Sequence, residues 1–339
     1  MGPGTDGPTG RQADGQTAST LMSTASDTDS MSGPAFAPVR SGFTPAQTGF
    51  APATLALAML GVAILAVVGA VTLRRRRFDR EIAAAVDELR SAATAKTGSE
   101  DVYTSEDLAD LPDPVQRYLD AVLTEGQARA RTARVEQRGE IRLGESWKPF
   151  TATQHFAVDP PGFVWDATVE FAPFLPVRVV DVYADGEGSL RAKLLSALTV
   201  SAAAPSPEVN ESELVRYLGE TAWNPTALLP TAGVEWEAID DESARATIED
   251  GRTTASLVFH FEDEEVRRVH TEARYRQEDD DVAPWTGYFD AYEEFDGVRV
   301  PTEAEVEWNL SDGDQPYWRG EVETVTYDSG SGSEGDTDE

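Results

Sequence analysis

Apolar and polar residues alternate with a period of two through much of the chain beyond residue 130. In segment 163–171 apolar residues recur at every second position, and in segment 298–308 they do so except at Thr302. An extended backbone places successive side chains on opposite faces, so this period predicts strands with one buried face. The chain is therefore expected to build a sheet around a core.

Further strands follow from the same pattern. They are expected at 131–143, 149–158, 176–184, 188–194, 197–203, 233–239, 243–249, 252–261, 265–276, 285–294 and 316–327. Turn pairs such as Asp185-Gly186 and Asp250-Gly251 favour tight hairpins between them. About a dozen consecutive antiparallel strands would form one strongly curved sheet, because open twisted sheets of more than about ten strands curl or split.

Two helical segments interrupt the strand pattern. The first, 112–123, opens with Pro112 and Pro114 and has one apolar face. The second, 211–229, carries Leu214, Tyr217, Leu218 and Trp223. A curled sheet needs material on its concave side, so we expect both helices there. The predicted fold is mainly β (α+β): a large curved antiparallel half-barrel at 111–328 around one or two helices.

The segment 51–73 contains no charged residue and is apolar on every side. At about 1.5 Å per helical residue it spans roughly 30 Å, the thickness of a bilayer's hydrocarbon core. We therefore predict one transmembrane helix. A signal peptide is the alternative, but its apolar region normally follows a basic start, whereas here the basic cluster comes after the apolar stretch.

Four consecutive arginines, Arg74–Arg77, follow the predicted span, whereas its other flank carries Arg40. Positive charge favours the cytoplasmic side, so we expect a single-pass protein of the cell membrane with a cytoplasmic body. Residues 74–94 keep a helical period and are expected to form a polar stalk. The segment 95–110 is rich in Ala, Thr, Ser and acids and is expected to be a linker.

Both ends of the chain lack packing residues. Residues 1–50 consist largely of Gly, Ser, Thr, Pro and Ala, and residues 329–339 of Gly, Ser, Thr and acids. Such compositions cannot bury enough apolar surface to order themselves, so a disordered arm and a disordered acidic tail are expected. Met22 and Met31 lie within the arm and are alternative start sites.

The chain is strongly acidic, with 61 Asp and Glu against 28 Lys and Arg and a net charge of −33. This balance argues against nucleic-acid binding and against adhesion of the body to anionic headgroups, because phosphates attract basic surfaces. The acids are spread along the chain, and the only lysines are Lys96, Lys148 and Lys193. In molar salt the Debye length falls to about 3 Å, so carboxylate repulsion is screened. We predict an extremely halophilic source; an ordinary acidic protein is the alternative.

Motifs for catalysis or cofactor binding are not found. The sequence has no GxSxG elbow, Walker A loop or HExxH helix, and it contains no cysteine. His155, His260 and His270 lack ligand spacing, although His260 and His270 could meet across a hairpin. We therefore predict no metal site, no cofactor and no assigned catalytic residue.

The most informative polar residues lie at 213–220. Arg216 and Glu220 are four residues apart and share a helical face, and Glu213 offers Arg216 a second carboxylate. Three interpretations are open: a solvated surface pair, a polar anchor inside a ligand cavity, or a catalytic carboxylate. The candidate ligand-binding residues are Arg216, Tyr217, Glu220 and Trp223.

Several short stretches resemble an uncharacterised domain family of bacteria and archaea, filed as a domain of unknown function, over about 111–328. They are 111–119 (LPDPVQRYL), 147–150 (WKPF), 161–165 (PGFVW), 214–220 (LVRYLGE), 223–226 (WNPT) and 317–319 (YWR). This resemblance implies no activity, ligand or catalytic residue. More loosely, a sheet wrapped over helices resembles the lipoprotein-carrier fold, whose hollow holds acyl chains.

These features favour a membrane-anchored, non-enzymatic domain that binds a lipid or other apolar ligand near the bilayer. A single span would hold such a cavity within reach of the lipid surface. One alternative is an enzyme of unknown reaction that uses Glu220 and Arg216. The other is a structural or interaction module without ligand. An unfilled apolar cavity of about 300 Å³ or more would favour ligand binding over the filled module.

Overall fold

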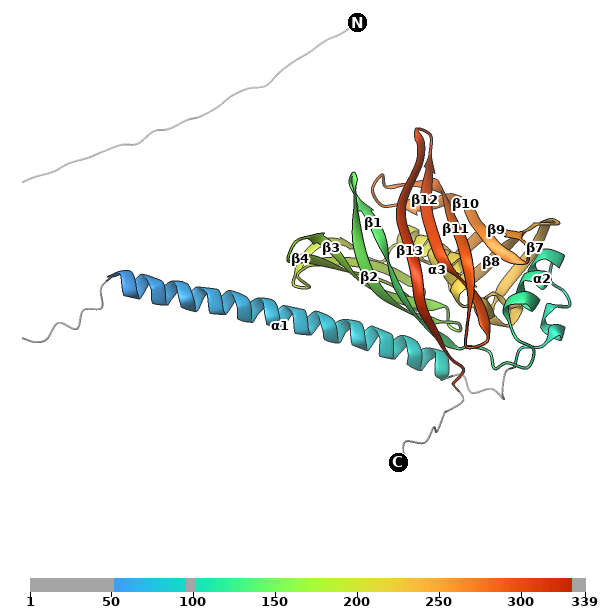
Figure 1. The fold of residues 1–339 in the computed structure, drawn as a ribbon, viewed down its shortest axis with the longest axis horizontal. Helices are drawn as coiled ribbons and strands as arrows, with labels where there is room; N and C mark the ends of the chain where they lie inside the picture. Colours follow the sequence, from blue (N-terminus) through green and yellow to red (C-terminus); the bar gives the residue numbers. More distant parts are fainter. Residues whose placement is uncertain (1–51, 96–101, 331–339) are drawn as a thin grey trace, which may run out of the picture. The chain divides into compact units, whose positions relative to one another are not determined.

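The computed structural model of the protein describes residues 52–95 and 102–330 (Figure 1). The arm expected at 1–50 lies outside the described residues, as do 96–101 of the expected linker and 331–339 of the tail. Within the rest of the linker, a short 3₁₀ turn forms at Ser105–Leu108, and Tyr103 and Leu108 are buried in the core.

Thirteen strands in the described residues form one antiparallel sheet. They are β1 (Thr132–Leu143), β2 (Ser146–Ala157), β3 (Gly162–Ala172), β4 (Leu175–Ala184), β5 (Glu187–Leu194), β6 (Leu198–Ala203), β7 (Val234–Asp240), β8 (Ser243–Asp250), β9 (Thr253–Glu262), β10 (Glu265–Arg276), β11 (Asp281–Phe295), β12 (Val298–Leu310) and β13 (Gly313–Asp328). Consecutive strands pair except β6 with β7, and β1 pairs with β13. The first and last strands therefore lie side by side, and β6 and β7 form the two edges.

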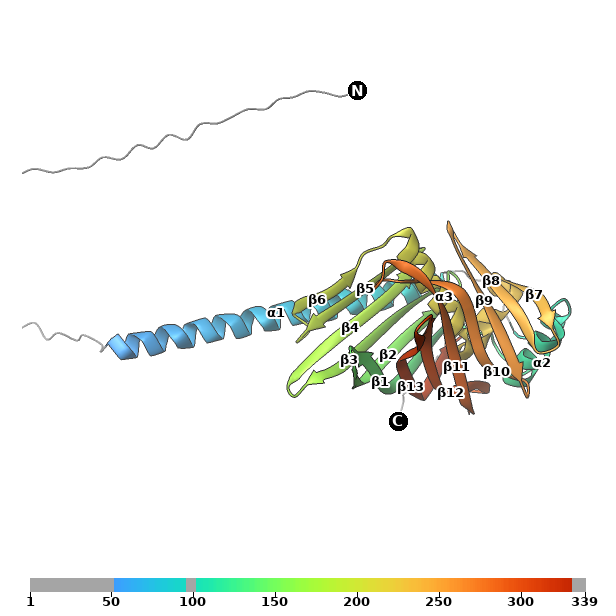
Figure 2. The same cartoon turned by 90° about the horizontal axis from the view of Figure 1, so that it is seen from above.

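The sheet curls into a half-barrel, as the number of strands predicted (Figures 1 and 2). Register shifts occur in several pairs, for example at Glu136/Gln137 between β1 and β13 and at Val306/Glu307 between β12 and β13. Such bulges bend a strand and increase its twist, which helps a long sheet to curve. The mainly β half-barrel expected from the sequence is confirmed.

The connection between the two edges crosses the concave face. It carries α3 (Pro207–Glu220) and three 3₁₀ turns at Thr221–Trp223, Pro225–Leu228 and Pro230–Ala232. Because β6 and β7 lie at opposite edges, the chain must pass from one side of the sheet to the other. α3 contacts β3, β4, β5, β9 and β10, and it lies within the curve of the sheet (Figure 1).

The second helix differs from its expected bounds of 211–229. It begins earlier, because the Ser206 hydroxyl accepts a hydrogen bond from the Val209 amide (3.2 Å) and caps the helix. It ends at Glu220, and the chain continues in short 3₁₀ turns. Pro225 and Pro230 explain the break, because each lacks an amide hydrogen and disfavours helical backbone in the residue before it.

The other helix of the body, α2 (Asp113–Val122), packs on the same side of the sheet. Its buried residues Val115, Tyr118, Leu119 and Val122 belong to the main core cluster. The Tyr118 ring lies 5.6 Å from the ring of Phe261 on β9. Both helices therefore fill the concave face, as expected.

The predicted span and stalk form one continuous helix, α1 (Pro52–Thr94). In the described residues it is the one helix long and apolar enough to cross a membrane. Its apolar half is exposed, whereas Phe78, Ile82, Leu89 and Ala93 are buried against the convex face of the sheet. They pack on Ala157, Val164 and Val180, so the second half of α1 is part of the folded body.

Candidate functional site

The first turn of α3 is hydrogen-bonded to the sheet, and the charged face of the helix follows this turn. The side-chain oxygen of Asn210 accepts a hydrogen bond from the Gly188 amide on β5 (2.8 Å). A Cβ at Gly188 would lie 2.8 Å from Glu213 Cγ and 2.9 Å from the Val209 carbonyl oxygen. Only glycine permits this close approach, which sets α3 directly against the concave side of β5.

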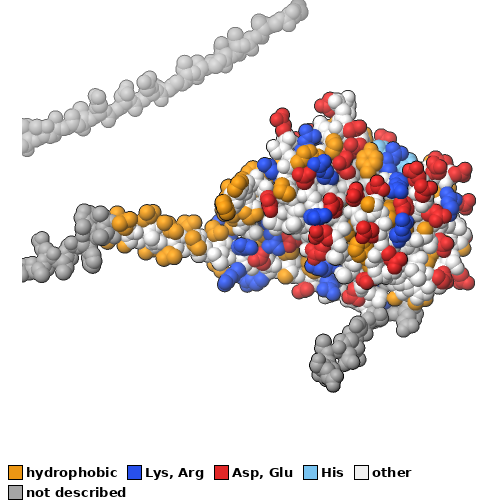
Figure 3. Space-filling model, viewed as in Figure 1, with side chains coloured by type: hydrophobic (Ala, Val, Ile, Leu, Met, Phe, Trp, Pro, Cys, Tyr) orange, Lys and Arg blue, Asp and Glu red, His pale blue; other side chains and the backbone are white. Residues whose placement is uncertain are grey.

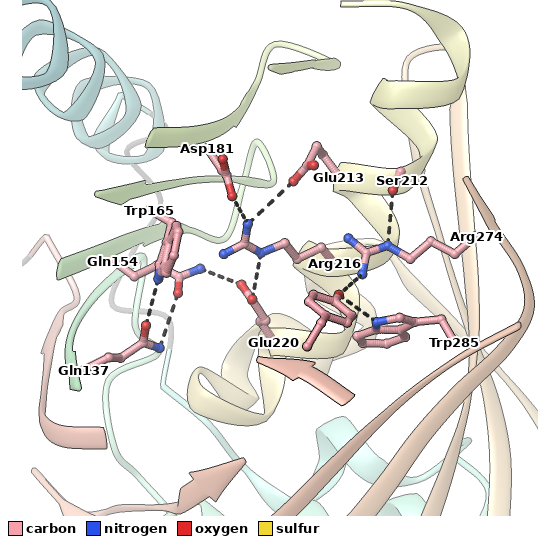
Figure 4. A network of polar contacts seen from close by, with 11 residues as sticks. Gln137, Gln154, Trp165, Asp181, Ser212, Glu213, Arg216, Glu220, Arg274 and Trp285 are labelled. Atoms are coloured by element: carbon pink, nitrogen blue, oxygen red, sulfur yellow. Dashed lines mark hydrogen bonds and ion pairs between the residues drawn. The ribbon is translucent and has the colours of Figure 1, made fainter. Parts of the chain in front are cut away.

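Arg216 is the centre of a buried polar cluster (Figure 4). Its Nε donates to Glu220 Oε1 at 2.8 Å, and its Nη1 donates to Asp181 Oδ2 on β4 at 2.5 Å. Glu213 Oε2 lies 4.0 Å from the same Nη1. We call these four residues the Arg216 cluster. It contains the helical pair expected from the sequence and one carboxylate from the sheet.

A chain of amides continues from Glu220 into the sheet (Figure 4). Gln154 on β2 donates to Glu220 Oε2 at 2.5 Å, and Gln137 on β1 donates to the Gln154 side-chain oxygen at 3.4 Å. The Trp165 indole donates to Gln137 at 2.9 Å. The indole N–H is the last donor in this chain of hydrogen bonds. Both buried glutamine side chains thus have hydrogen-bond partners, without which their burial would destabilise the fold.

A second arginine lies on the other side of α3. Arg274 on β10 donates from Nε to the Ser212 hydroxyl (3.1 Å) and from Nη1 to the Tyr317 hydroxyl (3.3 Å). The Trp285 indole donates to the same tyrosine oxygen at 3.0 Å. Two arginines thus connect α3 to opposite halves of the half-barrel.

Aromatic rings cover both guanidinium groups. Arg216 lies 4.9 Å from the Phe163 ring centre and 5.0 Å from that of Trp165. Arg274 lies 4.8 Å from the Trp285 ring centre. Such stacking stabilises an arginine that has lost water, because the ring face is negative. The two guanidinium charges are therefore stabilised by aromatic rings and hydrogen-bond acceptors of the protein rather than by solvent.

The cluster holds more negative charge than Arg216 alone can balance. Glu213, Asp181 and Glu220 face one directly bonded guanidinium, and Arg274 is the next nearest cation. Burial raises the pKa of Glu213 to about 7, with Asp181 and Glu220 adding to the rise while Arg216 opposes it. In the described residues, Glu213 Oε2 accepts no hydrogen bond. Near neutral pH the Glu213 carboxyl therefore carries a proton part of the time.

Glu213→Gln is expected to remove a pH dependence of stability. The folded-state pKa of about 7 lies above the ordinary value of 4.5. The stabilising contribution of the proton is thus complete below about pH 4.5 and is lost as the pH rises through 7. At about pH 8 the variant should be more stable than the parent by about 3 kcal/mol, measured by chemical denaturation. Glu211→Gln, an exposed change on the same helix, is the control, and an equal pH profile in both variants would contradict the argument.

The structure separates the four candidate residues into two groups. Arg216 and Glu220 form the predicted pair, but their side chains are only 15% and 17% exposed, so it is not a solvated surface pair. Tyr217 and Trp223 are core residues whose polar atoms bond to the carbonyl oxygens of Ala157 and Pro301. These two side chains do not join the Arg216 cluster.

Sequence reasoning missed Asp181, Gln154 and Arg274. Asp181 could have been found, because it falls at an inward position of a strand between Val179 and Tyr183. The other two lie on strands whose inner faces could not be matched to α3 in advance. His260 and His270 bond to Arg268 and Thr286, and no cluster of metal-binding side chains is found within 55–95 and 102–330.

Two cavities lie away from this cluster. The first, which we call the α3 hollow, has a volume of about 1020 Å³ and lies between the β4–β5 turn, the start of α3 and the β8–β9 turn. The second, the outer groove, has a volume of about 880 Å³ over β1, β11, β12 and β13. Charged pairs such as Arg138–Glu321 and Arg319–Glu140 line the outer groove. Both cavities are larger than the volume of about 300 Å³ expected for a ligand site, but polar side chains line much of each.

Comparison with protein families matches residues 109–327 to a family of unknown function, DUF6920. The chain belongs to this family. The match runs from the turn before α2 to the end of β13, and it confirms the family membership expected from the sequence. The DUF6920 body thus comprises the half-barrel and its internal helices. A comparison with curated proteins finds no match.

Solved structures similar to the DUF6920 chain share little sequence with it. A DUF1329 family protein from Desulfovibrio piger has 15% identity and a TM-score of 0.37, over 64% of this chain and 94% of that chain. A LolA superfamily protein from Nitrosomonas europaea has 10% identity and a TM-score of 0.31, over 65% and 94%. A β-barrel-like DUF1849 protein from Brucella abortus has 12% identity and a TM-score of 0.21, over 59% and 98%. These likenesses concern the fold alone.

Proposed function

We propose that the protein is a membrane-anchored binding domain for a lipid or another amphipathic molecule with an apolar part. The observation that carries this proposal is the α3 hollow, an unfilled space of about 1020 Å³ in a body that packs against the second half of α1. Sites for small ligands typically have volumes of about 300–1,000 Å³, so the space suits a molecule of lipid size.

The α3 hollow lies where the half-barrel is open. Edge strands β6 and β7 do not pair with each other, so the sheet does not close around α3. Apolar atoms of Pro205, Val215 and Ala273 line part of the hollow. Charged side chains such as Asp250 and Arg252 stand at its turns. This mixture favours a ligand with an apolar part and a polar group over a purely apolar one.

The Arg216 cluster supports binding better than catalysis. Arg216 and Glu220 bond to each other, and Glu220 also accepts from Gln154. A catalytic carboxylate must reach its substrate, whereas these atoms are occupied by protein partners. The cluster instead holds α3 in place and so shapes one wall of the hollow.

The body is proposed to lie on the cytoplasmic side of the cell membrane. The basis is the row Arg74–Arg77 directly after the apolar half of α1. Phe78, the next residue, is already buried against the sheet, so the body begins at the membrane surface. The acidic composition favours a molar-salt environment, and that habitat stays a prediction.

Filling the α3 hollow is expected to weaken ligand binding strongly without unfolding the body. The full chain, purified in mild detergent, should carry lipid detectable by native mass spectrometry. Ala273→Trp should lower the affinity for a fluorescent phospholipid at least about tenfold, since the new ring occupies the space. The control is Ala238→Trp, an exposed strand position on β7 outside the hollow. Equal binding by both variants, or no lipid on the parent chain, would refute the proposal.

A further inference from the structure

Exposed apolar side chains of the body gather at one end of the sheet. Half of the large apolar side chains exposed on residues 102–330 lie in two places. They are Phe171, Phe174 and Leu175 around the β3–β4 turn, and Leu198 and Val200 on β6. Strand register brings the two places together, because Val177 pairs with Leu194 and Leu194 pairs with Leu198.

The exposure and the backbone conformation of Phe174 are both unfavourable for a phenylalanine in water. Its side chain is 96% exposed, and its φ of 64° lies in the left-handed region. A bulky side chain is disfavoured there, and glycine would fit more easily. An apolar environment outside the body would explain why a phenylalanine stands at this turn.

The same end of the sheet lacks the charge found elsewhere. Segments 171–176 and 194–207 contain no charged residue, in a chain of which 26% is charged. The contrast is clear between the two edges of the sheet. Strand β7 carries Glu235, Glu237 and Asp240, whereas β6 carries only apolar residues, Ser and Thr. Charged side chains usually protect exposed edges from pairing in water, so an uncharged edge indicates a different environment.

Contacts between α1 and the sheet show that the uncharged end of the sheet faces the apolar half of α1. The side chain of Leu89 lies against Gly162, at the start of β3. Nearer the span, Asp79 pairs with Arg178, which is opposite Thr168 on β3. β3 therefore runs from the C-terminal end of α1 toward the apolar half of α1, and the β3–β4 turn lies at the end nearer the span. The β3–β4 turn lies on that side in both ribbon views (Figures 1 and 2), and β6 lies there in Figure 2.

Distances along the chain place the turn at the membrane boundary. Asp79 is six residues beyond Leu73, about 9 Å along the helix. Phe174 is four residues from Arg178, about 13 Å along the strand. The turn thus reaches the level at which the apolar half of α1 ends. Figure 3 shows hydrophobic side chains at this end of the body, with basic side chains beside them.

Basic side chains border the apolar patch. Lys148 Nζ lies 5.8 Å from the Phe171 ring centre, and Lys193 on β5 pairs with Thr199, which lies between Leu198 and Val200 on β6. These are two of the three lysines in the chain. Apolar tips surrounded by lysine and arginine are typical of surfaces that enter the headgroup region of anionic bilayers.

We propose that Phe171, Phe174, Leu175, Leu198 and Val200 form a membrane-docking face that inserts into the bilayer crossed by α1. The partner is an anionic phospholipid bilayer; the chain as a whole is acidic, but segments 171–176 and 194–207 carry no charge and Lys148 and Lys193 lie beside them. With α1 as the first attachment and this face as the second, the body is held in one orientation on the lipid surface. The inference requires α1 to cross the membrane, and it does not require a ligand in the α3 hollow.

The experiment uses the full chain in vesicles of phosphatidylcholine and phosphatidylglycerol with brominated acyl chains. Because the chain has no cysteine, single fluorescent labels can be placed with Ala172→Cys, Ala238→Cys and Val67→Cys. The label at 172 reports on the docking face, the label at 238 on the opposite edge and the label at 67 on the span. Quenching at 172 should be at least about threefold stronger than at 238.

Adding Phe174→Ser and Leu175→Ser should reduce quenching at 172 to the level at 238, with quenching at 67 unchanged. Equal quenching at 172 and 238, with the label at 67 still quenched, would overturn the docking face and leave the anchor intact. A dimer cross-linked through Ala172→Cys, without lipid quenching, would also overturn it in favour of pairing between two copies. Absence of quenching at 67 would refute the span and the docking face together.

Discussion

Arg216→Met is expected to lower the free energy of unfolding by about 3–5 kcal/mol, because removing one partner of a buried ion pair leaves uncompensated charge. Asp181 and Glu220 would then lose the cation that donates to them, and Glu213 would lose its nearest cation. Met keeps much of the apolar bulk that packs against Phe163 and so isolates the loss of charge. Denaturant unfolding at constant salt measures the effect.

Two comparisons decide whether charge is the cause. Arg138→Met removes an exposed arginine from the outer groove and should change stability little, because its partner Glu321 is also exposed. Adding Glu220→Gln to Arg216→Met should restore part of the lost stability, because it removes one of the stranded charges. A loss in Arg216→Met no larger than that in Arg138→Met would show that the cluster is not a strong stabilising element.

Trp223→Ala is expected to lower the free energy of unfolding by about 3–5 kcal/mol, the usual range for a large aromatic removed from a core. Trp223 is 2% exposed and meets the Phe289 ring edge-on at 6.1 Å between centres. Its indole donates to the Pro301 carbonyl, and Tyr327 donates to the Trp223 carbonyl. The residue therefore joins the turns after α3 to β11, β12 and β13.

Trp147→Ala is the matched control for this prediction. Trp147 lies near the rim of the sheet, is partly exposed and packs against the Arg319 guanidinium at 4.6 Å. Its removal should have a much smaller effect on the denaturation midpoint, because less apolar surface leaves the interior. Similar losses in both variants would contradict the view that α3 and its following turns fill the half-barrel.

The body departs from the usual distribution of side chains in two places. The Arg216 cluster holds charge inside the half-barrel, where α3 must pass from one edge of the sheet to the other. The docking face holds apolar side chains outside, where the span ends. The docking face lies at the β3–β4 turn and the α3 hollow at the β4–β5 turn, so the two are at opposite ends of β4.

Local sequence patterns predicted the strands with high accuracy. The segment 265–276 forms β10 with those bounds, and the alternation at 163–171 lies within β3. The uncharged segment 51–73 lies almost wholly within α1. The spacing of Arg216 and Glu220 predicted their pair, which forms at 2.8 Å. These features follow from the geometry of a single helix or strand, so a few neighbouring residues are enough to define them.

Other features depend on contacts that no local pattern contains. Asp181 and Gln154 reach α3 from strands 35 and 66 residues away from their partners, Arg216 and Glu220. Which inward-facing side chain meets the helix depends on strand register, on the curvature of the sheet and on the path of α3 between the edges. The exposure of Phe174 is also decided by the tertiary structure, because it depends on which segments pack over the β3–β4 turn. Periodicity determined which residues could face the core, whereas the packing of distant segments decided which of them meet.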